Sequence, residues 1–192
     1  SDDLPDDVIS LLSENADRYP IYEDDFSHLL YGKLMTEIYT QADMTHYQDV
    51  SEPIQNRIKD KIGEYKSFSE FAALIKTRQY TYSRISRSLL HILLNIYNDS
   101  TNNQKSLYAR ILGFRNSKSD LIKPLNNKIP IITKVADGEK IIEEYYEDNL
   151  ANAQALNQFN QTIYASEIYR FVQNDKFKNN LQNDYRRGVI IL

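Results

Sequence analysis

The spacing of apolar side chains predicts a mostly helical first half of the chain. Apolar residues recur every three or four positions, the period of an amphipathic helix, in these segments: 26–38, 54–62, 71–75 and 81–97. Pro5, followed by two aspartates, is typical of a first helical turn and predicts one more short helix near the N-terminus. We expect these helices to pack as a bundle over residues 1–98.

The pattern changes after the polar segment 98–103, which we take as a subdomain boundary. Three segments are strand candidates, of which the first is equally compatible with the end of a helix: 107–114, 129–135 and 189–192. Three others have helical spacing: 117–125, 138–160 and 163–172. The expected fold is therefore mainly α, a helical bundle followed by a small mixed α/β part over 104–192 with a short βαβ unit.

The composition is that of a globular protein of one domain or two small ones. The 192 residues include no Cys and no apolar run long enough to cross a bilayer, and the sequence shows no signal-peptide pattern. We expect a cytoplasmic protein without a membrane partner.

Charge is distributed unevenly along the chain. Residues 1–52 hold thirteen acids and two bases, whereas residues 53–136 hold fifteen bases and five acids, and residues 137–192 hold nine acids and six bases. The basic middle block fits a surface that faces a polyanion, and it fits equally a set of ion pairs with the acidic first segment.

The segment 76–94 concentrates the basic and aromatic residues of this block. On a helix over 81–97 its apolar residues form one stripe, and the opposite stripe carries Arg84, Arg87 and His91. Bases neutralise phosphates and tyrosine rings stack on unpaired bases, so this combination suits a structured RNA. The candidate RNA-binding residues are Lys76, Arg78, Tyr80, Tyr82, Arg84, Arg87 and His91. The alternative is a solvated helix face whose arginines pair with the acidic first segment while the tyrosines pack in the core.

No catalytic or metal-binding constellation accompanies this segment. His28 and His46 lack nearby partners at metal-ligand spacing, and adjacent acids such as Glu143 and Glu144 do not point toward a common centre on a helix. Phosphate-loop, dinucleotide-binding and hydrolase motifs are also missing from the sequence. We therefore expect no catalytic residue, metal or cofactor within these 192 residues.

Several ordered motifs carry a resemblance to a known family. They are KTRQYT at 76–81, RISR at 84–87, LLHIL at 89–93, YARILGF at 108–114, IPIITKV at 129–135 and ASEIY at 165–169. Over nearly its whole length the chain resembles the C-terminal region of the bacterial tRNA(Met) cytidine acetate ligases, a nucleotidyltransferase-like family.

The resemblance implies a function that the residues alone do not show. Members use ATP to activate acetate in an N-terminal nucleotidyltransferase domain and transfer the acetyl group to N4 of the wobble cytidine of elongator tRNA(Met). The family's ATP-binding motifs have no counterpart in this sequence, so the resemblance implies a tRNA-binding portion whose partners are the tRNA and its own N-terminal domain, with ATP bound in the full-length parent. The family tends to have a base where this chain has Gln79.

Two other functions remain open at this point. One is a protein-interaction or dimerisation domain that docks the catalytic half without touching nucleic acid, and homo-oligomer formation is compatible with either function. The other is a free-standing enzyme with an unrecognised carboxylate site.

Overall fold

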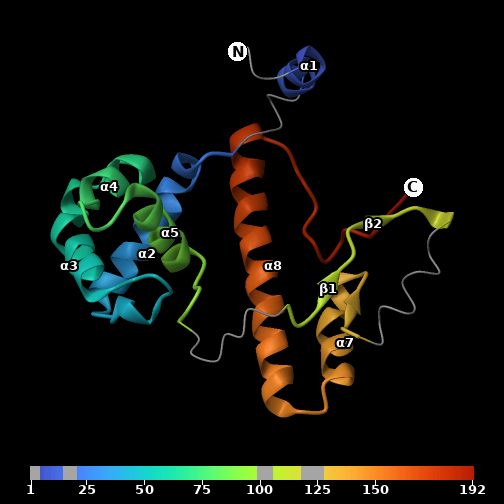
Figure 1. Cartoon of the computed structure of the whole chain (residues 1–192). Coiled ribbons are helices and arrows are strands. Elements are labelled where there is room, and N and C mark those ends of the chain that lie inside the picture. The colour runs from blue at the N-terminus through green and yellow to red at the C-terminus, as the bar shows by residue number, and fades with distance from the viewer. Residues whose placement is uncertain (1–4, 15–20, 99–105, 118–127) are drawn as a thin grey trace. The chain divides into compact units, whose positions relative to one another are not determined.

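The computed structural model describes residues 5–14, 21–98, 106–117 and 128–192, and the chain divides into two compact units. The first unit comprises Ser1–Asp99 and Phe171–Asn180, and the second comprises Ser100–Arg170 and Leu181–Leu192. Helices account for most of the described structure and the strands are two residues long, so the mainly α class is confirmed (Figure 1). No helix in the described ranges is both long enough and apolar enough to span a membrane.

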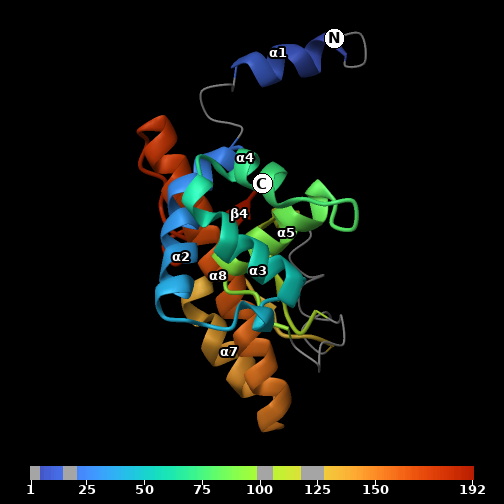
Figure 2. The ribbon, with the colours of Figure 1, turned by 90° about the vertical axis from the view of Figure 1, so that its left-hand side faces the viewer.

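Short helices build the first unit, and all of them except the first, which has no buried residue, have an apolar inner face. They are α1 (Asp6–Glu14), α2 (Ser27–Tyr39), α3 (Glu52–Lys61), α4 (Phe68–Ile75) and α5 (Tyr82–Leu93), with short 3-10 turns at Glu23–Phe26, Met44–His46 and Ile62–Glu64. Helix α5 packs against α2 and α4, and α3 packs against α4, so that α2 to α5 form one group (Figures 1 and 2). The fully buried core includes Leu30, Leu34, Ile54, Ile58, Phe71, Ile85 and Leu89, whose spacing within each helix is the one that the sequence predicted.

Helix α5 ends earlier than the expected residue 97. Asn95 adopts a positive φ of 54°, a conformation that asparagine tolerates better than most residues. The N–H of Asn95 donates to the carbonyl of Ile92, and the N–H of Ile96 donates to that of His91. These two bonds are the pattern of a helix C-terminus closed by a left-handed residue.

The second unit combines short parallel strands with two helices. Strand β1 (Ala109–Arg110) pairs in parallel with β3 (Ile131–Ile132), and β2 (Gly113–Phe114) pairs in parallel with β4 (Ile190–Ile191). Segment 107–114 thus contains two short strands and not the end of a helix. Nearly all of the expected helix at 117–125 lies outside the described residues.

The two C-terminal helices divide differently from the sequence prediction. Helix α7 covers only Gly138–Tyr145, and α8 runs without interruption over Asn149–Phe177, so the expected break near 160–163 is wrong. Asp148 starts α8 by accepting the N–H of Leu150 at 3.0 Å. The Thr162 hydroxyl donates to the carbonyl of Gln158 inside the helix, so this polar stretch continues the helix instead of ending it.

A compact core holds this unit together. Its members are Ile132, Val135, Ile142, Ala155, Phe159 and Ile163. Gly138 begins α7 directly against Phe159, and a Cβ at this position would lie 2.3 Å from a carbon of the ring. Only glycine allows α7 to approach α8 this closely.

Candidate nucleic-acid interface

Helix α5 has an apolar face that is buried in the core and a polar face on the opposite side. Ile85, Leu89 and Ile92 are fully buried. Thr81 caps the helix, its hydroxyl accepting the N–H of Arg84 at 3.4 Å. With the start and the inner face fixed in this way, the side chain of Arg84 points outward from the first turn.

The turn that precedes α5 is held by specific hydrogen bonds. The N–H of Thr77 donates to the carbonyl of Tyr80, and the Thr77 hydroxyl accepts the N–H of Tyr80 at 3.0 Å. On the side of α4, Arg57 donates from Nε to the carbonyl of Ile75 at 2.8 Å and so satisfies a carbonyl at the end of that helix. The fixed turn leaves Lys76 and Arg78 exposed.

Three of the predicted bases on this surface have no acidic partner. Lys76, Arg78 and Arg84 are exposed, and none of them has a carboxylate within 4.0 Å among the residues that the structure describes. The guanidinium of Arg84 lies over the ring of Tyr80, 5.0 Å from its centroid, and this stacking restricts the arginine. We call these three residues the open basic surface.

The two predicted tyrosines support this surface from within. Tyr80 is only 8% exposed, and its hydroxyl accepts a hydrogen bond from Ser51. Tyr82 is half-buried and its hydroxyl donates to the carboxylate of Glu23. Burial, together with that carboxylate, raises the pKa of Tyr82. Both tyrosines therefore fit the alternative in which they pack in the protein better than the one in which their rings stack on RNA bases.

Arg87 and His91 lie one turn further along and share a carboxylate. Arg87 Nε is 2.6 Å from Oδ2 of Asp49, and Nδ1 of His91 is 3.5 Å from the same oxygen. Nδ1 of His91 is also 2.8 Å from the carbonyl of Gln48. The basic stripe predicted from the sequence is thus split into an open part and a part paired with the acidic first segment.

Sequence reasoning missed two residues that shape this face, Arg57 and Asp49. Each acts across a long stretch of chain, Arg57 on the end of α4 and Asp49 on the side of α5. The acidic first segment signalled that some arginine would be paired, but nothing in the sequence pattern selects Asp49 among its thirteen acids.

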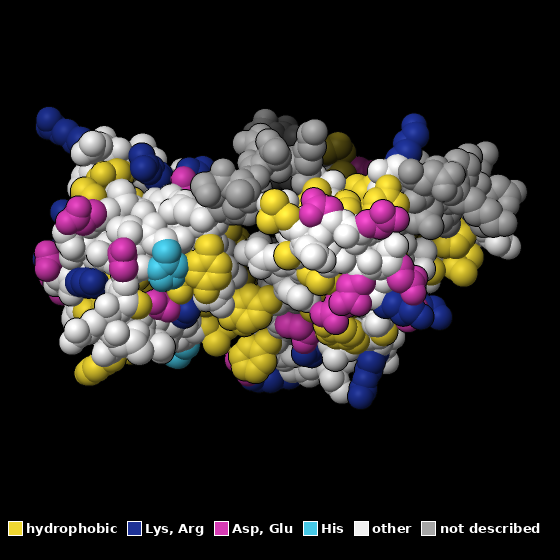
Figure 3. All heavy atoms as spheres, turned by 90° about the horizontal axis from the view of Figure 1, so that it is seen from below, with side chains coloured by type: hydrophobic (Ala, Val, Ile, Leu, Met, Phe, Trp, Pro, Cys, Tyr) yellow, Lys and Arg dark blue, Asp and Glu magenta, His cyan; other side chains and the backbone are white. Residues whose placement is uncertain are grey.

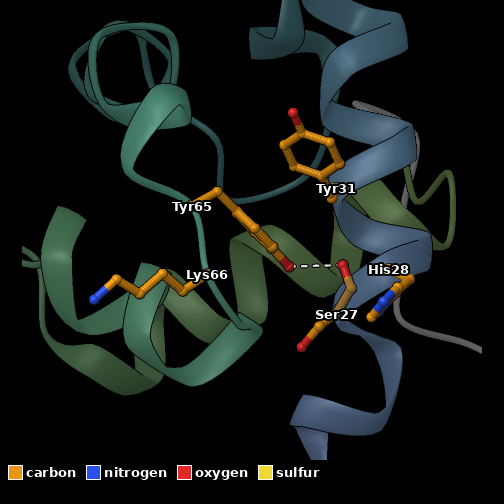
Figure 4. Close-up of a pocket in the computed structure, with 5 residues that line it drawn as sticks. All are labelled: Ser27, His28, Tyr31, Tyr65 and Lys66. Atoms are coloured by element: carbon orange, nitrogen blue, oxygen red, sulfur yellow. Dashed lines mark hydrogen bonds between the residues drawn. The ribbon is translucent and has the colours of Figure 1, made fainter.

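A small pocket on the first unit lies between the start of α2 and the segment before α4 (Figure 4). It has a volume of about 220 Å³ and is lined by Ser27, His28, Tyr31, Tyr65 and Lys66. The Tyr65 hydroxyl donates to the carbonyl of Ser27 at 2.8 Å, and burial raises the pKa of Tyr65 to about 12. The pocket offers two aromatic rings with centroids 5.2 Å apart and no carboxylate in its lining.

The second unit has a pocket of about 310 Å³ built around an ion pair. Arg110 Nη1 lies 2.8 Å from Oδ2 of Asp184, and both side chains are mostly buried. The hydrogen bond from Arg110 holds the pKa of Asp184 below its usual range. The pair connects the segment at Asp184 to β1, and the two charges neutralise each other.

Exposed acidic side chains of the second unit gather on α7 and on the turn that follows it. Figure 3 shows acidic side chains close together over this unit, and the exposed carboxylates of α7 and the turn after it are Glu139, Glu143, Glu144, Glu147 and Asp148. Such a surface repels a polyanion. Within the described ranges, no three His, Cys, Asp or Glu residues are grouped closely enough to hold a metal ion.

Comparisons with known proteins agree in pointing to one family. A family model described as HIGH Nucleotidyl Transferase matches residues 1–184. Two curated relatives are tRNA(Met) cytidine acetate ligases. The one from Clostridium perfringens (strain ATCC 13124) is 30% identical over 95% of this chain and 44% of its own length, and the one from Thermoanaerobacter sp. (strain X514) is 29% identical over 86% and 39%.

Solved structures show the same fold. Thermotoga maritima TmcAL bound with alpha-thio ATP superimposes with a TM-score of 0.78 at 20% identity, covering 98% of this chain and 47% of that one. Its apo form gives a TM-score of 0.76. The chain thus spans less than half the length of the relatives that it matches.

Proposed function

Because this chain belongs to the HIGH Nucleotidyl Transferase family, we propose that it is the tRNA-facing portion of an ATP-dependent tRNA(Met) cytidine acetate ligase. In this proposal it corresponds to the C-terminal part, a helical bundle over 1–98 and a small α/β part over 104–192. The remainder of the protein is a nucleotidyltransferase domain that binds ATP and activates acetate. The complete enzyme acetylates N4 of the wobble cytidine of elongator tRNA(Met).

The observation that carries this proposal is the open basic surface. Lys76, Arg78 and Arg84 project from a fixed turn and a capped helix start without acidic partners. Exposed bases on a rigid support bind a phosphate backbone at little conformational cost, and they hold a substrate without transforming it. This role fits a chain whose curated relatives are more than twice as long.

The test is tRNA binding by the 192-residue chain at several salt concentrations. We expect the double substitution Arg78→Ala/Arg84→Ala to weaken binding and to reduce the slope of log K against log salt by about 1.8, since each phosphate contact contributes about 0.9. A matched control is Lys66→Ala/Lys140→Ala, which removes the same charge from side chains that are 76% and 77% exposed. Equal slopes for the two double variants would contradict the proposal.

One observation favours the protein-interaction alternative. Leu112, Ile190 and Ile191 are all more than half exposed, although they lie in or beside the paired strands β2 and β4. Exposed apolar groups on neighbouring strands suit a protein contact. If tRNA binding is indifferent to Arg84, and Ile190→Lys abolishes self-association or capture of the catalytic half in sedimentation, this alternative replaces the proposed function.

A further inference from the structure

Asp49 lies against Arg87 and His91 of α5, which are not part of the open basic surface. Its Oδ2 accepts a hydrogen bond from Arg87 Nε at 2.6 Å and is 3.5 Å from Nδ1 of His91. The carboxylate thus touches two of the predicted RNA-binding side chains from outside the helix. Arg87 remains 58% exposed, and its two terminal nitrogens have no hydrogen-bond partner among the described residues.

The backbone holds Asp49 in this place. Its φ is 62°, in the left-handed region that glycine, asparagine and aspartate adopt more readily than other residues. Its carbonyl accepts the hydroxyl of Ser88 at 2.9 Å, and the N–H of the preceding Gln48 donates to the carbonyl of Ile96. The loop is therefore tied to α5 independently of the contact between the carboxylate and Arg87.

We propose that Arg87, beside His91, forms a phosphate site on α5 and that the Asp49 carboxylate occupies this site until an RNA phosphate displaces it. The inference rests on the proposed function and deepens it, because it adds one phosphate position to the open basic surface and names the group that covers it. The ligand class is a phosphate of an RNA backbone.

The chemistry of the site supports the exchange. A carboxylate and a phosphate accept the same charge-assisted hydrogen bonds from a guanidinium, and arginine favours both. An ion pair as exposed as this one contributes little to stability, so a phosphate that also contacts the terminal nitrogens of Arg87 competes with it effectively. Asp49 is then a positioning residue that holds Arg87 ready and keeps other anions away.

Removing the carboxylate without disturbing the loop tests the inference. Asp49→Asn keeps a residue that tolerates positive φ, and Asp49→Gly is a second variant that removes any strain there. The control is Asp43→Asn, which removes the same charge from the same loop but from a carboxylate whose hydrogen bonds go to Thr45. Thermal melting verifies that every variant is folded.

We expect both Asp49 variants to bind tRNA about threefold to tenfold more tightly than the unmodified chain, with a salt slope steeper by about 0.9. Asp43→Asn should change binding by less than about twofold, since a solvated charge without a phosphate contact is screened. In an Arg87→Ala background, Asp49→Asn should lose most of its effect.

The binding results distinguish the phosphate site from the proposed function. If the Asp49 variants bind tRNA no better than Asp43→Asn while the Arg78/Arg84 variant is weakened, the phosphate site is refuted and the proposed function stands. If the unmodified chain does not bind tRNA, the proposed function fails, and a short inorganic polyphosphate serves as the probe. If the Asp49 variants bind polyphosphate more tightly and Asp43→Asn does not, the phosphate site is supported. Any other result overturns it.

Discussion

The buried charge cluster of Lys33, Glu37 and Tyr47 gives the sharpest prediction about stability. Lys33 Nζ lies 2.6 Å from Oε1 of Glu37, and the Tyr47 hydroxyl donates to the same oxygen at 2.8 Å. Glu37 is 7% exposed and Tyr47 is 1% exposed. The perturbation is Lys33→Met, which retains most of the aliphatic stem and removes the ammonium group.

The expected cost follows from leaving a buried carboxylate unpaired. Removing one partner of a buried ion pair costs about 3 to 5 kcal/mol. Because the side chain of Lys33 is 24% exposed, water can partly replace the ammonium, and the expected loss is nearer about 2 to 3 kcal/mol. The matched control is Lys61→Met, whose pair with Glu64 lies at the surface with side chains 40% and 57% exposed and should cost under about 0.5 kcal/mol.

The dependence on pH adds a second signature. Burial raises the pKa of Glu37, but the hydrogen bonds from Lys33 and Tyr47 outweigh it and leave the pKa below its usual value. The carboxylate therefore stabilises the fold above the pKa of the unfolded chain, and this contribution is lost as the pH falls through the folded pKa. Without Lys33 the burial effect dominates, the folded pKa rises above the unfolded one, and the variant regains stability relative to the unmodified chain as the pH is lowered.

Urea unfolding, followed by circular dichroism and tyrosine fluorescence, measures both effects. With a typical m-value of about 2 kcal/mol/M, the midpoint of Lys33→Met should fall by about 1 M at neutral pH and by less in acid. The reasoning is refuted if Lys33→Met and Lys61→Met cost the same, or if the difference between Lys33→Met and the unmodified chain is independent of pH.

Two further substitutions test the packing and capping of the fold. Asp24→Ala removes the carboxylate that accepts the N–H and the hydroxyl of Ser69 at the start of α4, each at 2.7 Å, and should cost about 1 kcal/mol at neutral pH. The backbone hydrogen bond from Ser69 lowers the pKa of Asp24. The stabilisation is therefore present above the pKa of the unfolded chain and disappears as the pH falls through the folded pKa. A difference in urea midpoint between Asp24→Ala and the unmodified chain that is the same at all pH values would contradict this. Gly138→Ala should destabilise the second unit by about 1 to 3 kcal/mol because its methyl group meets the Phe159 ring, and Phe159→Leu in the same chain should recover part of the loss in thermal melts.

The sequence predicted the helices of the first unit well because their signals are local. Apolar spacing and caps, such as Thr81 before α5, lie within a few residues of the element that they specify. Short strands are also found within the strand candidates, because 109–114 and 129–135 are rich in apolar and β-branched residues.

What escaped prediction depends on distant partners or on rare backbone conformations. The sequence divided the helical spacing into 138–160 and 163–172, but Phe159 and Ile163 pack into one core and α8 continues through the polar residues between them. The pairing of Arg87 joins residues 38 positions apart, and an aspartate alone does not specify the left-handed conformation that Asp49 adopts. Predicting which bases stay unpaired requires the positions of all the acids, and the charge of a segment does not supply them.

The charge cluster and the basic face of α5 are connected through the loop that joins α2 to α3. Tyr47 anchors this loop by donating to Glu37 and by stacking on Tyr97 at 5.1 Å, and Asp49 follows two residues later. Because a rigid loop holds the carboxylate at a fixed distance from Arg87, loosening the anchor should weaken that contact as well as the core. Tyr47→Phe, which keeps the stacked ring but loses the hydroxyl, separates the two roles. If Asp49 covers Arg87 only while its loop is anchored, this variant binds polyanions more tightly, in addition to losing the roughly 1.5 to 3 kcal/mol of a hydrogen bond to a buried charge.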